Sequence, residues 1–302
     1  MRNTVPPTFD WKYYLENNPD LGKAGITDKR GAVQHYLTFG HKENRQICAP
    51  TQSPGIHEPL LPPMSLIRDG SADVNSFLQT GKHFLDLFVN LGKLKPTETV
   101  LDVGSAIGRM ALPLTQYLRP PGKYYGFDIT RDTVTWCQKN ITPRYPQFIF
   151  SHCDIQNSHY NPGGRIHPAN VTFDYPDNTF DFVFLTSVFT HMHRPEMERY
   201  LQEIRRVLKP GGRCLLTYFI WNSESSKLVT EGKASQPFRY HYDKYHLIDL
   251  KNVCGAVAYD ESYVLDQLDK YGLQLDHPIQ YGSWCQRSHP VSYQDVIVAH
   301  KI

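Results

Sequence analysis

The stretch Glu98-Thr-Val-Leu-Asp-Val-Gly-Ser-Ala-Ile-Gly-Arg-Met110 decides the fold of this chain. A short apolar run leads to an acid, Asp102, and a turn with two glycines, Gly104 and Gly108, follows. An apolar helical pattern begins at Ile107, so the stretch predicts a strand, a tight turn and a helix. Because glycine has no Cβ, the turn allows a ligand to lie against bare backbone at the positive end of the helix.

The spacing of the glycines excludes two common phosphate-binding motifs. A dinucleotide fingerprint would need glycine at Ala106 and Arg109, and the Gly-Lys-Ser/Thr ending of a P-loop is absent. Asp102 stands two residues before the first glycine, where its negative charge repels a pyrophosphate and attracts a cation. S-adenosylmethionine carries an ammonium and a sulfonium centre and no phosphate, so the turn favours this cofactor over a nucleotide.

Three further strand-like runs follow the first. Residues 123–128 end at Asp128, a carboxylate that can accept hydrogen bonds from both hydroxyls of a ribose. Residues 148–154 end at Asp154, which is placed to meet an adenine amino group, whereas 180–186 have no terminal acid. Strands that end in acids about 26 residues apart suit βα units of a parallel sheet, which binds ligands at the carboxyl ends of its strands.

Together these motifs resemble those of class I S-adenosylmethionine-dependent methyltransferases. Motif I corresponds to residues 100–108 and the strand-four segment to 185–191. The segment Arg205-Arg-Val-Leu-Lys-Pro-Gly-Gly-Arg213 then runs into a fifth strand, 214–219. The resemblance covers residues 64–302.

The resemblance implies an α/β fold with a Rossmann-like, mostly parallel sheet of seven strands whose last strand is antiparallel. Ala106 stands where the family usually has glycine, and we expect a slightly tighter cleft there without loss of binding. The implied cofactor is S-adenosylmethionine. The residues expected to bind it are Asp102, Gly104, Ser105, Ala106, Gly108, Arg109, Asp128, Ile129, Asp154, Ile155, Thr186 and Ser187.

Composition narrows the class of protein. The 302 residues suffice for one large domain and a small one. The net charge of +2 is too small to indicate a nucleic-acid partner. The six cysteines form no Cys-x-x-Cys pair, which favours a reducing compartment over a disulfide scaffold. Because no apolar run approaches the roughly 18 residues that span a bilayer, and no signal-peptide core is present, we expect a cytoplasmic protein (in the host cytoplasm if the chain is viral).

Residues 1–46 are predicted to form a small helical module, separate from the rest. Helical spacing occurs in 9–15 and 32–39, and Pro19 interrupts the chain between them, which predicts two helices held by aromatic packing. The pattern resembles a small module of glycosyltransferases and other surface-glycan proteins, bacterial and viral. Five prolines in 47–63 predict an extended linker to the methyltransferase domain.

The rest of the chain supplies elements around the cofactor. Residues 73–92 are predicted to form a helix over the cofactor cleft, with Asp73 or Ser71 as its N-cap. Beyond residue 261 we expect a helix, a strand at about 277–281 and a final strand at 295–299.

Two long polar inserts, residues 155–177 and 222–257, are expected at the acceptor side of the cofactor. Trp284 is expected to stack on a sugar face, and Arg287 to hold hydroxyls or a phosphate; ordinary loop and hairpin packing is the alternative for each. The candidate acceptor-binding residues are Tyr160, Arg165, His193, Tyr218, His241, Trp284 and Arg287.

His191 is the first candidate for a general base, because it follows the fourth strand on the acceptor side and imidazole titrates near neutral pH. A capping or packing role for His191 is the alternative. No cluster of carboxylates or histidines has the spacing of a metal site, so we expect no metal, although metal-dependent O-methylation is a rival mechanism.

The favoured hypothesis is an O-methyltransferase for a sugar of a surface glycan, a deoxyhexose such as rhamnose. Glycosyltransferases of the same pathway are then possible partners, and no nucleic acid is expected. The alternatives are O- or N-methylation of a non-sugar metabolite and a catalytically silent scaffold in a glycan-assembly complex. Intact Asp102, Gly104 and Asp128 argue against the scaffold.

Overall fold

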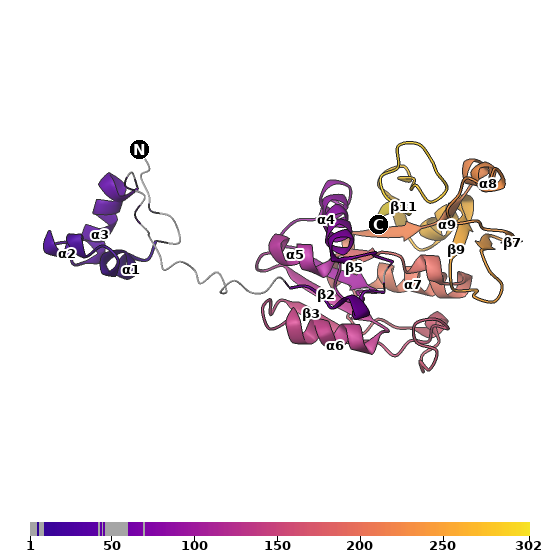
Figure 1. The fold of residues 1–302 in the computed structure, drawn as a ribbon, viewed down its shortest axis with the longest axis horizontal. Coiled ribbons are helices and arrows are strands. Elements are labelled where there is room, and N and C mark those ends of the chain that lie inside the picture. Colours follow the sequence, from indigo (N-terminus) through magenta and orange to yellow (C-terminus); the bar gives the residue numbers. More distant parts are fainter. Residues whose placement is uncertain (1–4, 6–8, 42, 44, 46–59, 69) are drawn as a thin grey trace. The chain divides into compact units, whose positions relative to one another are not determined.

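The computed structural model describes residues 5, 9–41, 43, 45, 60–68 and 70–302. The chain divides into two compact units, Met1–Leu60 and Leu61–Ile302 (Figure 1). The predicted linker at 47–63 lies mostly outside the described residues, so its extended conformation stays a prediction.

The described residues of the N-terminal unit form three short helices where the sequence predicted two. Pro19 does not merely separate helices; it is the first residue of the middle one, a position where its missing N–H is not needed. Tyr14 and Tyr36 are buried in its core, and Tyr14 Oη lies 2.9 Å from His35 Nδ1. The helices are α1 (Trp11–Glu16), α2 (Pro19–Lys23) and α3 (Lys29–His35), followed by a π-helical turn, Tyr36–Gly40.

The larger unit is built on a seven-stranded sheet, as predicted, and its strands follow the order β10-β11-β5-β4-β1-β2-β3. β11 is antiparallel to both neighbours, while the β5–β4–β1–β2–β3 pairs are parallel. The strand expected at 277–281 is wrong, because β10 lies earlier and Gln280 makes only an isolated bridge to Val296. The strands are β1 (Thr99–Val103), β2 (Lys123–Asp128), β3 (Phe148–His152), β4 (Phe180–Leu185), β5 (Leu208–Tyr218), β10 (Leu273–Leu275) and β11 (Asp295–Lys301).

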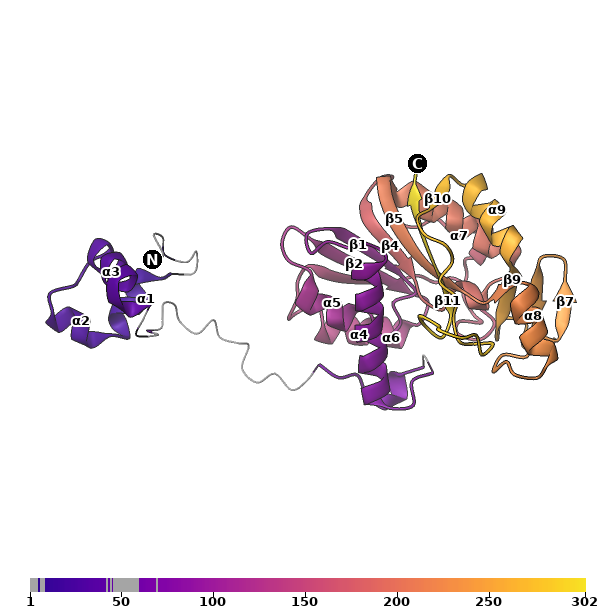
Figure 2. The same ribbon diagram turned by 90° about the horizontal axis from the view of Figure 1, so that it is seen from above.

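Helices flank this sheet, with α5 and α6 near β1–β3 and α7 and α9 near β5 and β10 (Figures 1 and 2). Helix α4 packs its Phe88 on Phe184 of β4, with ring centroids 4.3 Å apart. Asp73 caps α4 through a reciprocal capping box with Ser76, as one of the two predicted caps. No helix in the described ranges combines the length and apolar character needed to cross a membrane. The helices are α4 (Val74–Asn90), α5 (Ala111–Tyr117), α6 (Arg131–Asn140), α7 (Arg194–Val207) and α9 (Glu261–Lys270).

The insert at 222–257 is more regular than the sequence predicted. It begins with α8 (Ser223–Thr230) and contributes strands to a second, four-stranded sheet in the order β6-β9-β8-β7. Phe219, Phe238 and Trp284 pack together at its base. The strands of this sheet are β6 (Ile220–Trp221), β7 (Tyr240–Tyr242), β8 (Tyr245–Leu247) and β9 (Val257–Asp260).

Candidate active site

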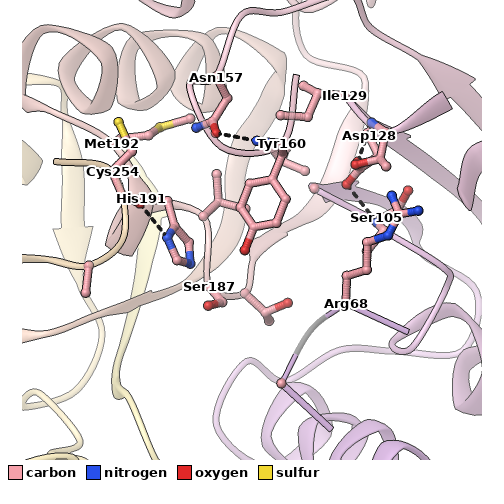
Figure 3. A pocket seen from close by; sticks show the side chains of 18 of the residues that line it. Arg68, Ser105, Asp128, Ile129, Asn157, Tyr160, Ser187, His191, Met192 and Cys254 are labelled. Carbon is pink, nitrogen blue, oxygen red and sulfur yellow. Dashed lines mark hydrogen bonds between the residues drawn. The ribbon is translucent and has the colours of Figure 1, made fainter. Parts of the chain in front are cut away.

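A cavity of about 1120 Å³ opens at the carboxyl ends of β1, β2 and β4 (Figure 3). The segments that follow these strands supply its walls, as expected for a ligand site in a parallel sheet. The predicted cofactor residues that line the cavity are Gly104, Ser105, Ala106, Arg109, Asp128, Ile129, Ile155, Thr186 and Ser187.

The turn after β1 is held against β2. The backbone N–H groups of Gly104 and Ser105 both donate to the carbonyl of Phe127, at 2.9 and 3.0 Å. Gly104 has φ +91°, and Ala106 has φ +43°, in the left-handed region that alanine rarely adopts. The consequence of alanine at 106 is therefore backbone strain, which the sequence analysis did not foresee. The turn extends beyond Ile107, so α5 begins at Ala111 and not at Ile107 as predicted.

Replacing Ala106 by glycine is expected to stabilise the protein. Alanine in a left-handed conformation destabilises the folded state by roughly 1–2 kcal/mol, and glycine removes this strain. Glycine also has more conformational freedom in the unfolded chain, which offsets about 0.5–1 kcal/mol of the gain. We expect Ala106→Gly to raise the free energy of unfolding by about 0.5–1 kcal/mol in urea denaturation. The control Ala111→Gly, in the right-handed helix α5, should lower it by a similar amount. A less stable Ala106→Gly protein would contradict the strain.

Asp128 is the predicted cofactor acid that lines the cavity. Its Oδ2 accepts the N–H of Ala106 at 2.8 Å, and its Oδ1 accepts the N–H of Thr130 at 2.7 Å. Burial raises the pKa of Asp128, and these hydrogen bonds oppose that rise. Each carboxylate oxygen keeps a second lone pair, so the side chain can still accept hydrogen bonds from a ligand.

Asp102 does not play the part that the sequence predicted. It is 1% exposed, lies outside the cavity lining, and Tyr124 donates a hydrogen bond to its Oδ2 at 2.6 Å. Burial raises the pKa of Asp102 to about 8, which opposes its ionisation near neutral pH. Its direct attraction for a cation is therefore corrected. Gly108, which is likewise outside the lining, serves the turn through its φ of +82°.

Asp154 also lies apart from the cavity. Its carboxylate accepts hydrogen bonds from Arg165 Nε at 2.6 Å and Asn161 Nδ2 at 3.2 Å, and the Arg165 guanidinium lowers its pKa. It lines a neighbouring groove together with His152. In the structure Asp154 and Arg165 therefore pair with each other outside the cavity lining, while Ile155 lines the cavity.

The remaining wall suits S-adenosylmethionine. Among the described side chains that line the cavity, Ser105 has a buried Oγ without a hydrogen-bond partner. Gly104 leaves bare backbone in the same wall, because a Cβ there would meet Val188 at 2.5 Å. Asp128, bare backbone and the unpartnered Ser105 hydroxyl together fit a ligand with a ribose and an amino-acid end.

On the acceptor side, His191 ends a single 3₁₀ turn, Phe189–His191, after β4. Its Nδ1 lies 2.9 Å from the carbonyl oxygen of Cys254, to which it can only donate. Figure 3 shows the rings of Tyr160 and His191 beside each other, with centroids 5.7 Å apart and planes at 86°. Burial lowers the pKa of His191. The structure thus brings together two predicted residues from separate segments.

The comparisons with known proteins agree with this arrangement. The sequence profile of the methyltransferase domain family matches residues 101–216. The chain contains a class I S-adenosylmethionine-dependent methyltransferase domain. Its cofactor is S-adenosylmethionine.

Three similar proteins illustrate the relationship. The 2-phytyl-1,4-naphtoquinone methyltransferase of Trichormus variabilis is 24% identical over 226 residues, which are 72% of this chain and 87% of the relative. The 2-methyl-6-phytyl-1,4-hydroquinone methyltransferase of Synechocystis is 29% identical over 148 residues, 49% of this chain but only 39% of that relative. The PH0226 protein of Pyrococcus horikoshii shares the fold, with a TM-score of 0.52 at 16% identity over 75% of this chain and 92% of its own.

Two predicted acceptor residues of the methyltransferase domain are buried in its interior. Trp284 is fully buried and its Nε1 donates to Asp295 Oδ2 at 2.7 Å. Arg287 Nη1 donates to Asp295 Oδ1 at 2.8 Å, and its guanidinium lies over the ring of Tyr281, 4.6 Å from the centroid. Neither lines the cavity. The roles expected for them at a sugar are corrected to bracing of the C-terminal loop.

Two further candidates also lie away from the cavity lining. Tyr218 is fully buried in β5 and stacks on Phe189. His241, in the exposed strand β7, pairs with His246 through their Nδ1 atoms at 2.7 Å. Of the seven predicted acceptor residues, Tyr160 and His193 line the cavity.

The structure adds residues that sequence reasoning missed. The backbone carbonyl of Cys254 orients His191. Because every residue has such a carbonyl, the sequence does not indicate which one will meet a given histidine. Glu196 lines the cavity beside His193, whose N–H donates to Glu196 Oε2 at 2.7 Å. A glutamate three residues after the N-cap is the pattern of a capping box, so the sequence could have indicated this contact. The other missed lining residues with polar side chains include Arg68, Asn157, Gln236, Ser292, Tyr293 and Gln294.

Proposed function

We propose that this methyltransferase methylates a hydroxyl of a small polar acceptor, a sugar such as rhamnose or another deoxyhexose of a surface glycan. The observation that carries the proposal is the hydrogen bond from His191 Nδ1 to the Cys254 carbonyl. With Nδ1 carrying the proton, Nε2 has the lone pair of a general base. Glycosyltransferases of the same pathway are the partners that the N-terminal module suggests.

His191 is prepared to accept a proton. Because burial lowers its pKa, the imidazole is neutral at pH 7. S-adenosylmethionine supplies a methyl group on a positively charged sulfur, open to attack by an oxygen. His191 takes the proton that the acceptor hydroxyl loses, and Asp128 holds the ribose end of the cofactor. Such a base contributes about 10²–10⁴-fold to the rate.

The polarity of the cavity supports an acceptor with several hydroxyl groups. Gln236 and Ser292 line it, together with His193 and Glu196. Buried hydroxyls need hydrogen-bond partners, and these side chains supply both donors and acceptors.

A quinone or hydroquinone is the second candidate acceptor. It is favoured by the names of the two relatives described above. Met192, Phe219 and Val253 add apolar surface to the cavity, which an aromatic ring would contact.

The test compares both acceptor classes in one assay. The full chain is incubated with S-adenosylmethionine and, separately, rhamnosides, other deoxyhexosides and a naphthohydroquinone, and products are weighed by mass spectrometry. One added methyl group on a deoxyhexoside, absent with Asp128→Ala protein, supports the proposal. Methylation of the naphthohydroquinone without any methylated saccharide overturns the sugar assignment.

A further inference from the structure

Ser187, two residues after the end of β4, has φ +62°, in the left-handed region. Of the seven non-glycine residues with positive φ in the described part of the chain, Ala106 and Ser187 line the cavity. A serine in this conformation is strained, and such strain persists only where neighbouring groups hold it. For Ala106 the holding group is Asp128. The left-handed conformation of Ser187 must therefore be stabilised by other groups.

Two side chains that are distant from Ser187 in the sequence, Thr217 and Gln294, hold it in this conformation. The Ser187 N–H donates to Thr217 Oγ1 at 2.7 Å, and Thr217 Oγ1 donates to Gln294 Oε1, also at 2.7 Å. Gln294 Nε2 completes the ring by donating to Ser187 Oγ at 2.9 Å. Every donor in this ring meets an acceptor, so backbone and side chain of Ser187 are fixed together. We call these three residues the Ser187 clamp.

The clamp is anchored on a rigid base. Thr217 is fully buried in β5, and Gln294 directly precedes Asp295, the first residue of β11. The buried Asp295 carboxylate accepts hydrogen bonds from Trp284 and Arg287 as well as from two backbone amides. The residues that the sequence placed at a sugar therefore fix the neighbour of Gln294.

We propose that Gln294 and Thr217 are positioning residues, which act on the cofactor through Ser187. They hold Ser187 in the left-handed conformation in which it lines the cavity, and their loss weakens cofactor binding because Ser187 relaxes. The proposal rests on the placement of Ser187 at the cofactor, which the proposed function shares.

The test is a double-mutant cycle on the full chain, with the dissociation constant of S-adenosylhomocysteine measured by titration calorimetry. Gln294→Met removes two hydrogen bonds of the clamp and should raise this constant about tenfold. In a Ser187→Gly background the same change should raise it less than about twofold, because glycine adopts positive φ without support. Gln294→Glu should stay within about twofold of the wild type, since its oxygens accept from both hydroxyls.

An equal rise in both backgrounds, or no rise in either, overturns the proposal, because a purely structural loss would not depend on the residue at 187. If Gln294→Met does not fold, Thr217→Val against Thr217→Ser repeats the comparison in the two backgrounds with the same expected outcomes. The titration contains no acceptor. Failure to methylate any saccharide therefore overturns the proposed function alone, and lost coupling in a chain that methylates saccharides overturns the clamp alone.

Discussion

Asp128→Ala is expected to raise the dissociation constant of S-adenosylhomocysteine about 100-fold in titration calorimetry, because a charged hydrogen-bond acceptor for the ribose contributes about 1.5–3 kcal/mol. The same change leaves the N–H groups of Ala106 and Thr130 without the carboxylate that now accepts them. The turn after β1 then keeps its hydrogen bonds to the Phe127 carbonyl but loses the one to Asp128, which adds to the loss of affinity. Asp128→Asn, which keeps one accepting oxygen, should fall between the two proteins.

Asp154→Ala is the matched control. The same carboxylate is removed one strand further along the sheet, but from a side chain that contacts Arg165 and lies outside the cavity lining. We expect its affinity to stay within about twofold of the wild type, since an exposed ion pair contributes little. Equal losses for Asp128→Ala and Asp154→Ala would restore the adenine contact that the sequence predicted. An unchanged Asp128→Ala protein would show that the cofactor's ribose lies elsewhere.

The acids at the ends of β1, β2 and β3 show which features the sequence alone could predict. Repeated strands with acidic ends predicted the parallel sheet, and the resemblance predicted its antiparallel last strand; both are confirmed. The sequence could not rank the acids, because exposure to the cavity depends on tertiary packing. Tyr124 from the neighbouring strand donates a hydrogen bond to the buried Asp102. Arg165 from the insert donates one to Asp154, which lies outside the cavity lining.

The acceptor side was harder to predict, for a physical reason. Trp284 and Arg287 have the chemistry of sugar-binding residues, and the same chemistry satisfies a buried carboxylate, Asp295. Which partner they meet depends on the path of a loop more than on residue type. The Ser187 clamp was invisible for a similar reason, since its members lie 30 and 107 residues from Ser187 along the chain.

His191→Ala is expected to lower kcat by about 10²–10⁴-fold, the contribution of a positioned general base, with cofactor affinity nearly unchanged. His191→Gln should lose a similar factor, because its amide can still donate to the Cys254 carbonyl but cannot accept a proton at neutral pH. The pair separates catalysis from packing. If the glutamine variant keeps most of its turnover, His191 orients the loop and is not the base.

The pH profile supplies an independent check on the same residue. Burial lowers the pKa of His191, so its basic form persists below the ordinary histidine value of about 6.5. We expect wild-type kcat to stay level from pH 8 to about 6.5 and to fall only at lower pH. The His191→Gln profile should lack this acidic limb, whereas His193→Gln should retain it.

The same shift has a consequence for stability, with a defined sign. The folded state binds a proton at His191 less readily than the unfolded chain, whose histidine pKa is about 6.5, so acid favours unfolding. The contribution of neutral His191 to the free energy of unfolding is present above this pH and is lost as the pH falls toward the lower folded value. Urea denaturation at pH 7.5 and 5.5, chosen as roughly one unit either side of that value, should therefore show a smaller loss for His191→Gln than for the wild type. An equal loss would place the titrating group elsewhere and would remove the argument that burial keeps this imidazole ready to accept the acceptor's proton.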